Sequence, residues 1–143
     1  MELHNAMGPT REQFVEVRDS TDPTPVVMVN LLRFRDRAIY EDGRASDLSG
    51  LEAFMVYSDL MKPIVEGFGG RFLLSTLLDR LVMGSGEMGW HRLGLVEYPS
   101  RAVFSQVMRD PTVHAAAVHR QAGLEGQLLI SSTLHADHRP ASA

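Results

Sequence analysis

Two patterns of apolar residues divide the chain into strands and helices. Residues 26–34 form a continuous apolar run, rich in valine and leucine, which predicts a strand that is buried on both faces and is therefore central. Residues 51–68 carry apolar residues at helical spacing, which predicts a helix with one face in the core. That stripe consists of Leu51, Phe54, Met55, Ser58, Met61 and Val65. Pro63 lies inside this helix and is expected to kink or restart it.

The second half of the chain repeats the order of strand and helix. After the glycines at 67, 69 and 70, the predicted strands are residues 72–78 with 81–83, then 90–98, then 127–134. A glycine-rich turn at 84–89 separates the first two of these strands. A helical run over 102–121, broken at Asp110-Pro111, precedes the last strand, and Gly123 is expected to end it.

Polar residues that can cap a helix precede each helical segment. They are Thr10, Ser46 or Ser49, Ser100 and Asp110. Gln13 follows Thr10 by three positions, the spacing of a capping box, and predicts a short helix over 10–17. Pro111 follows Asp110 at the first helical position, where its missing N–H has no cost.

The predicted order is a helix followed by β-α-β-β-α-β, the ferredoxin-like pattern of α+β proteins, with an antiparallel sheet and two helices on one face. We expect a single domain over residues 1–143, with its core at 25–134, an N-terminal helix and connector at 1–24 and a flexible tail at 135–143. The strands are apolar on both sides, so the face without helices predicts an interaction surface. The simplest cover is a second copy related by a two-fold axis, which makes the protein a homodimer.

Composition narrows the classes of function. The 143 residues contain no cysteine, which excludes disulfides, thiolate metal sites and cysteine nucleophiles. The net charge of -4 is spread along the chain, so no nucleic-acid partner is expected. No apolar run approaches the length of a membrane span, and the first residues lack the features of a signal peptide. We therefore expect a cytoplasmic protein without a membrane partner.

Many short motifs resemble domain-of-unknown-function family 1330, a bacterial family of the dimeric α+β barrel superfamily. They are Pro25 to Phe34, Tyr57, Pro63, Gly69-Gly70-Arg71, Trp90, Glu97 to Phe104, Asp110-Pro111, His119-Arg120 and Ala122-Gly123-Leu124. Members of the family usually carry an acidic residue after the tryptophan, where this chain has His91. The family has no agreed activity. Its superfamily includes cofactor-independent monooxygenases, haem-degrading enzymes, isomerases, cyclases and binding domains, and the fold does not choose among them.

Three residues are candidates for catalysis. Asn30 interrupts an apolar strand, so its amide either pairs with the backbone or a neighbouring strand, or faces a pocket and orients a substrate oxygen. Tyr57 can donate to a substrate oxygen or act as an acid, or it lies at the edge of the core. His114 can serve as a general base, or it is solvated. His114 and His119 diverge by roughly 140° on a helix, so no metal site is expected.

Four residues are candidates for substrate binding. Arg33, Arg71 and Arg120 can anchor a carboxylate through two parallel hydrogen bonds, or they form surface ion pairs. Trp90 can form the wall of a pocket for a flat ligand, or it packs in the core. Trp90 and His91 are neighbours on a predicted strand, so their side chains should not line the same cavity.

We expect a small cofactor-independent enzyme that acts on a small oxygenated organic molecule by proton transfer, isomerisation, cyclisation or oxygenation. Its pocket would lie between the sheet and the helices, near Asn30, Tyr57 and Trp90, with Arg33 or His114 as further lining residues. One alternative is a module that binds a small ligand without changing it. A second alternative is haem binding or degradation, which requires a histidine that faces the pocket.

Overall fold

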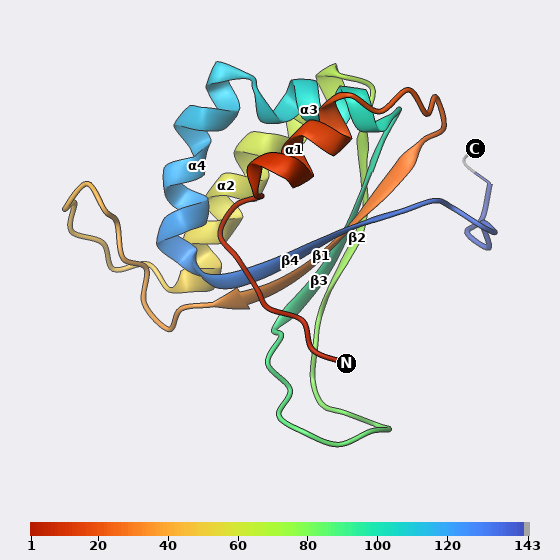
Figure 1. Ribbon diagram of the computed structural model, residues 1–143. Coiled ribbons are helices and arrows are strands. Elements are labelled where there is room, and N and C mark those ends of the chain that lie inside the picture. Colours follow the sequence, from red (N-terminus) through yellow and green to blue (C-terminus); the bar gives the residue numbers. More distant parts are fainter. Residues whose placement is uncertain (142–143) are drawn as a thin grey trace.

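The computed structural model describes residues 1–141, in which a four-stranded antiparallel sheet carries all the helices on one side (Figure 1). The strand order is β2-β3-β1-β4. This confirms the predicted α+β ferredoxin-like fold with an additional N-terminal helix. In chain order the elements are α1 (Arg11–Arg18), β1 (Val26–Phe34), α2 (Gly50–Gly67), β2 (Arg71–Leu77), β3 (Arg92–Tyr98), α3 (Arg101–Met108), α4 (Pro111–Gly123) and β4 (Leu124–Ser132).

β1 is the central strand, as its continuous apolar run predicts. It pairs antiparallel with β3 on one side and with β4 on the other. Its alternate side chains Val26, Met28 and Leu32 point to the helices and are almost fully buried. Val26 and Met28 pack with Met61 and Val65 of α2, so the main core lies between β1 and α2.

The capping residues act where the sequence places them. The Thr10 side chain accepts a hydrogen bond from the Gln13 backbone and the Gln13 side chain bonds back, which completes the capping box of α1. Ser49, rather than Ser46, caps α2 in the same way. Ser100 caps α3 and Asp110 caps α4.

Of the two outcomes expected at Pro63, a restart of the helix is wrong, because α2 continues from Gly50 to Gly67 with Pro63 inside it. A kink stays a prediction. Proline removes one N–H donor and leaves the carbonyl of the residue four positions earlier without its helical partner. Both Pro63 and Asp59 are exposed, so water can satisfy that carbonyl. The helix therefore does not have to restart at Pro63.

Gly123 does not end α4 ahead of a loop; it is the last helical residue, and β4 follows at once with Leu124. Its role is close packing. A Cβ at Gly123 would collide with the Gly50 backbone oxygen and would lie 2.9 Å from the Phe54 nitrogen. Glycine at this position allows α4 to lie directly against the start of α2.

Strand boundaries differ from the sequence prediction in three places. Residues 81–83 are not a strand, and Val82 and Met83 are 98% and 89% exposed in the loop between β2 and β3. β3 begins at Arg92, after Trp90 and His91, and β4 begins at Leu124 and ends at Ser132. The predicted tail has no helix or strand through residue 141, and residues 142–143 lie outside the described part of the chain.

The side of the sheet opposite the helices is apolar. Strand register places Val29 of β1 opposite Leu95 of β3 and Ile130 of β4, with all three on this side. We call it the outer sheet face, and it consists of Val29, Leu31, Leu74, Leu93, Leu95, Leu128 and Ile130. Leu74 is 46% exposed and Ile130 43% exposed, although both are large apolar residues.

Within residues 1–141, no helix is long and apolar enough to cross a membrane.

Candidate functional site

A chain of polar side chains lies on the helix-facing side of the sheet. Asn30 accepts a hydrogen bond of 2.9 Å from Nε2 of Gln127 on the neighbouring strand β4. The other end of the Gln127 amide, Oε1, accepts bonds of 3.1 and 2.7 Å from Nε and Nη2 of Arg120 on α4. We call these residues, with Tyr57 beside them, the Arg120 network. It links a strand asparagine to a helix arginine through one bridging amide.

Arg120 has no carboxylate partner among residues 1–141. Its third bond goes from Nη1 to the backbone oxygen of Met7, at 2.9 Å. A guanidinium has five N–H donors, so two remain for a ligand. Burial lowers the pKa of Arg120, because the charged form loses hydration without a negative charge nearby. An anion at this position would supply the missing counter-charge.

Tyr57 of α2 adds a further donor beside Arg120. Burial raises the pKa of its hydroxyl, and the positive charge of Arg120 offsets part of that rise. The hydroxyl makes no hydrogen bond to any residue of the described chain, and its oxygen retains access to solvent. At neutral pH Tyr57 is therefore protonated and free to donate to a bound oxygen.

Asn30 is in the right place but its amide is already engaged. Nδ2 donates long bonds to the backbone oxygens of Met28, at 3.3 Å, and of Gly94, at 3.4 Å. Gly94 of β3 lies directly opposite Asn30, and a Cβ there would meet only the Asn30 Cβ, at 3.9 Å. Asn30 thus holds Gln127 in position.

Two residues of this region were missed by sequence reasoning. Gln127 connects Asn30 to Arg120, and Arg92 at the start of β3 lies with its guanidinium carbon 5.5 Å from the centre of the Phe54 ring. Both stand opposite the buried Leu32 in the strand register, Arg92 on β3 and Gln127 on β4. In the sequence, Arg92 and Gln127 are polar residues within predicted strands. That they face the helices is known only once the strand register is known.

Arg33 and Trp90 lie away from the Arg120 network. They line a hollow of about 410 Å³ together with Asn5, Glu87, Met88 and Gly89. Arg33 is already engaged there, by Glu125 at 3.1 Å and by the Gly89 oxygen at 2.9 Å. Asn30 does not line this hollow. Arg33 follows Asn30 by an odd number of strand positions, so its side chain points to the other face of the sheet.

Trp90 and His91 do not line the same cavity, as predicted. His91 stacks on Phe34, and its Nδ1 accepts a bond of 3.0 Å from the Phe34 backbone N–H, so its ring carries the proton on Nε2. The side chain thereby continues the pairing at the end of β1. Trp90 instead borders the hollow.

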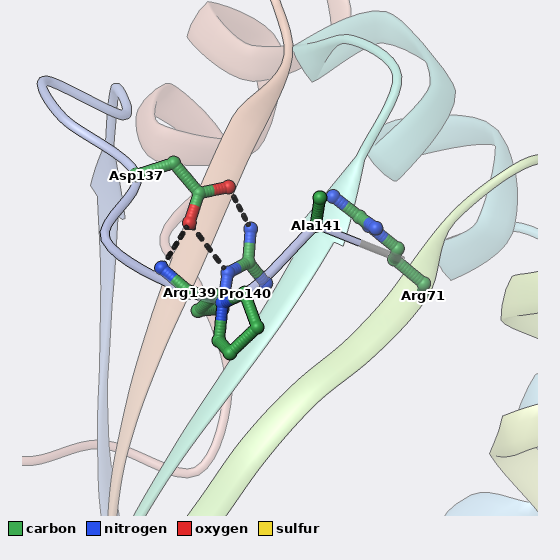
Figure 2. Close-up of a pocket in the computed structure, with 5 residues that line it drawn as sticks. All are labelled: Arg71, Asp137, Arg139, Pro140 and Ala141. Carbon is green, nitrogen blue, oxygen red and sulfur yellow. Dashed lines mark hydrogen bonds and ion pairs between the residues drawn. The ribbon is translucent and has the colours of Figure 1, made fainter. Parts of the chain in front are cut away.

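Arg71 lies at the opposite end of the sheet, beside the C-terminal tail. It lines a cavity of about 280 Å³ with Asp137, Arg139, Pro140 and Ala141. Figure 2 shows the Asp137–Arg139 pair on one side of this cavity and Arg71, from β2, on the other. Arg71 is paired with Glu97 at 3.0 Å, so its charge is already balanced.

Neither histidine of α4 reaches the Arg120 network. His114 is exposed in the first half of the helix. His119 is bonded through Nδ1 to the Tyr40 hydroxyl, at 2.8 Å. A general base from His114 is therefore not part of the arrangement around Asn30.

Alkaline pH should destabilise the protein through its buried tyrosines. The pKa of Tyr57 and that of Tyr98 are both raised above the ordinary value of 10.0, chiefly by burial. The folded state holds these protons more tightly than the unfolded state, so this stabilisation is complete below pH 10 and is lost as pH rises above it. Each tyrosine should contribute a slope of up to about 1.4 kcal/mol per pH unit.

Urea unfolding at several pH values around 10 would measure this loss. The double variant Tyr57→Phe, Tyr98→Phe should lose markedly less stability over the same range. Parallel loss in wild type and variant would show that other groups control the alkaline limit.

Solved structures share the fold over most of the chain. A protein of unknown function from Rhodopseudomonas palustris is 31% identical, with a TM-score of 0.82, and the match covers 94% of this chain and 100% of that one. SnoaB, a cofactor-independent oxygenase from Streptomyces nogalater, is 13% identical, with a TM-score of 0.53 and coverage of 82% and 99%. A hydroxynitrile lyase from Passiflora edulis is 10% identical, with a TM-score of 0.55 and coverage of 82% and 100%.

Sequence comparison identifies a family but no activity. No protein of curated function matches the chain. Residues 43–134 match the domain of unknown function DUF1330, in agreement with the motifs noted in the sequence. The chain therefore belongs to the DUF1330 family.

Proposed function

We propose that this protein is a small cofactor-independent enzyme that acts on a small oxygenated organic molecule, and that Arg120 and Tyr57 bind a carbonyl or carboxylate oxygen of that molecule. The observation that carries the proposal is Arg120 itself. It is a partly buried cation without a carboxylate partner among residues 1–141, and its charge acts on the Tyr57 hydroxyl, which makes no hydrogen bond there.

The chemistry that suits this pair is stabilisation of negative charge on oxygen. Donors fixed beforehand around a developing oxyanion contribute about 10²–10³-fold to the rate for each donor. The raised pKa of Tyr57 keeps its proton in place at neutral pH, so Tyr57 acts as donor or acid. Asn30 acts indirectly. It holds Gln127, and Gln127 in turn fixes two of the Arg120 nitrogens. Asn30 is therefore a positioning residue.

Proton transfer, isomerisation, cyclisation and oxygenation can each pass through an enolate or another oxyanion, which such a site would stabilise. The fold itself is compatible with chemistry of this kind, since a cofactor-independent oxygenase and a hydroxynitrile lyase share it. Both are less than 25% identical to this chain, so they share its fold and not its site.

A binding module without catalysis is the second candidate. It is favoured by the composition of the Arg120 network, which holds an amide pair, a guanidinium and a phenol but neither a carboxylate nor a histidine. A ligand that is already an anion needs no base in order to bind there. Haem binding gains no support from α4, because His114 is exposed and His119 is bonded to Tyr40.

Binding of small acids and carbonyl compounds should test the role of Arg120. We expect at least one of acetoacetate, pyruvate, benzoate and acetylacetone to raise the melting temperature of the wild-type protein saturably. Ligand at 100 times its Kd adds about 2.7 kcal/mol of stability, a shift of several degrees. Arg120→Gln should abolish this shift and Tyr57→Phe should weaken it.

Arg109→Gln is the matched control, because Arg109 follows directly after α3 and its side chain bonds only the Ser105 backbone oxygen within the described chain. A shift that survives Arg120→Gln would contradict the proposed site. For a compound that binds, NMR would follow its turnover. Conversion slowed about 10²-fold or more by Tyr57→Phe identifies an enzyme, whereas recovery of unchanged compound identifies a binding module.

We also infer that the protein forms a homodimer through its outer sheet face. Its seven apolar residues extend across all four strands, on alternate positions that the register assigns to one side. Every helix of the described chain lies on the other side of the sheet (Figure 1). A two-fold axis would let two such faces cover each other. This arrangement leaves the Arg120 network, on the helix side, outside the interface.

A further inference from the structure

Arg92 is a second cation on the helix-facing side without a counter-charge. Its guanidinium lies over the ring of Phe54, and it forms neither an ion pair nor a hydrogen bond with any residue of the described chain. Burial lowers the pKa of Arg92, and no nearby negative charge raises it again. The contact with the ring compensates only part of the lost hydration.

The position of Arg92 relative to Arg120 follows from the strand register. Leu32 of β1 stands opposite Arg92 on one side and opposite Gln127, which binds Arg120, on the other. Two strand spacings separate β3 from β4, so the backbone positions of Arg92 and Gln127 are roughly 10 Å apart. Both residues point toward the helices.

Two aromatic rings and the Leu32 side chain lie between the two cations. The Phe54 ring, beside Arg92, is 5.6 Å from the ring of Tyr57, which lies beside Arg120. Gly94 follows Arg92 by two positions on the same face and carries no side chain there. A small molecule that reaches from one guanidinium to the other would therefore contact Leu32 and the two rings along its middle and polar groups at both ends.

We propose that the helix-facing site binds a small organic dianion, one end at Arg120 with Tyr57 and the other end at Arg92. Its chemical class is a dicarboxylate, or a carboxylic acid with a second anionic oxygen at the far end of a short apolar or aromatic spacer. This rests on the proposed function, because the Arg120 end is the same site. A monoanion would leave Arg92 without a partner, so a second negative charge is what the site selects.

Calorimetric titration of the full chain with matched acids tests this inference. The probes are adipate against hexanoate and terephthalate against benzoate. We expect at least one dicarboxylate to bind about tenfold more tightly than its monocarboxylate partner. Arg92→Gln should reduce that dicarboxylate to the affinity of the monocarboxylate and leave the monocarboxylate unchanged. Arg92→Lys keeps the charge without the planar fork and should give an intermediate preference.

The variants also separate the two proposals. Equal affinity for both members of each pair in the wild type, or a preference that persists in Arg92→Gln, would overturn the dianion inference. If the monocarboxylates still bind and Arg120→Gln abolishes their binding, the proposed function stands without the dianion inference. If no acid binds at all, the dianion inference falls, and the proposed function falls with it unless a carbonyl compound such as acetylacetone binds through Arg120.

A melting curve without ligand checks the fold of each variant and gives a second readout. Arg92→Met removes a partly buried charge that has no partner, and it should raise the melting temperature while the preference for the dianion is lost. A large fall in melting temperature would instead show that Arg92 supports the core through Phe54, and this would count against the inference. Arg109→Gln again serves as the control variant.

Discussion

Gly123→Ala should lower the free energy of unfolding by about 3 kcal/mol, at the upper end of the range for overpacking a well-packed core. The added methyl would collide with the Gly50 backbone oxygen and approach the Phe54 nitrogen to 2.9 Å. These are backbone atoms at the start of α2, so no side chain can rotate away to relieve the collision. The helices must separate.

Gly50 forms the α2 side of the same contact, so Gly50→Ala should lower the free energy of unfolding by a similar amount. A Cβ at Gly50 would collide with the Arg35 backbone oxygen and lie 2.7 Å from the Gly123 oxygen. Three segments therefore meet at backbone distance, and Arg35 bonds both glycines, through its N–H to Gly123 and its oxygen to Gly50. The end of β1, the start of α2 and the end of α4 form one joint.

Urea unfolding followed by circular dichroism measures these losses, and Gly67→Ala is the matched control. Gly67 is also helical, but a Cβ there would meet nothing within 4 Å. That variant should be neutral or slightly stabilising, since alanine favours helix by up to about 1 kcal/mol over glycine. Equal stability of Gly123→Ala and wild type would show that the helices can shift without cost.

The joint also bears on the function proposed for the site. Arg120 precedes Gly123 by three positions and Gln127 follows it by four, so the joint fixes the helix end from which Arg120 meets Gln127. A mild displacement of α4 would weaken ligand binding before it unfolds the protein. A binding loss in Gly123→Ala larger than its stability loss would be the signature of that displacement.

The sequence predicts most of the fold because the relevant signals are local. Thr10 with Gln13, Ser100 and Asp110 each satisfy N–H groups within their own first helical turn, so spacing alone reveals them. Gly123 shows the limit of such signals. A glycine near a predicted helix end is usually read as a stop, but here its conformation is ordinary and its role is contact with a residue 73 positions earlier, Gly50. That partner cannot be read from local pattern.

The candidate site was predictable residue by residue but not as an arrangement. Asn30 stood out as an amide in an apolar strand, and Tyr57 and Arg120 as polar groups on helices. What joins Asn30 to Arg120 is Gln127, whose place depends on the register between β1 and β4. Trp90 was expected near Asn30 as the wall of a pocket for a flat ligand, yet it precedes β3 and borders a separate hollow. Which of these residues lie close together across the sheet could be seen only in the structure.

Leu95→Lys should convert the proposed homodimer into a monomer. Leu95 lies at the centre of the outer sheet face, opposite Val29 on β1 and Leu74 on β2. In a two-fold dimer every substitution occurs twice, so two ammonium groups would lose their water at one apolar interface. Burial of an unpaired charge costs several kcal/mol, and the dimer Kd should rise by about 10³-fold or more. In the monomer Leu95 is only partly buried, so lysine there can reach solvent.

Sedimentation velocity or light scattering coupled to gel filtration would measure the change in mass, with circular dichroism to confirm that the variant is folded. Leu60→Lys is the matched control, because Leu60 is an exposed leucine of α2, 46% exposed, on the helix side of the sheet. It should leave the mass unchanged. A wild-type protein that is monomeric at micromolar concentration, or a Leu95→Lys variant that keeps the dimer mass, would exclude the outer sheet face as the interface. Because the Arg120 network lies on the other side of the sheet, a folded Leu95→Lys monomer should still bind its ligand with wild-type affinity.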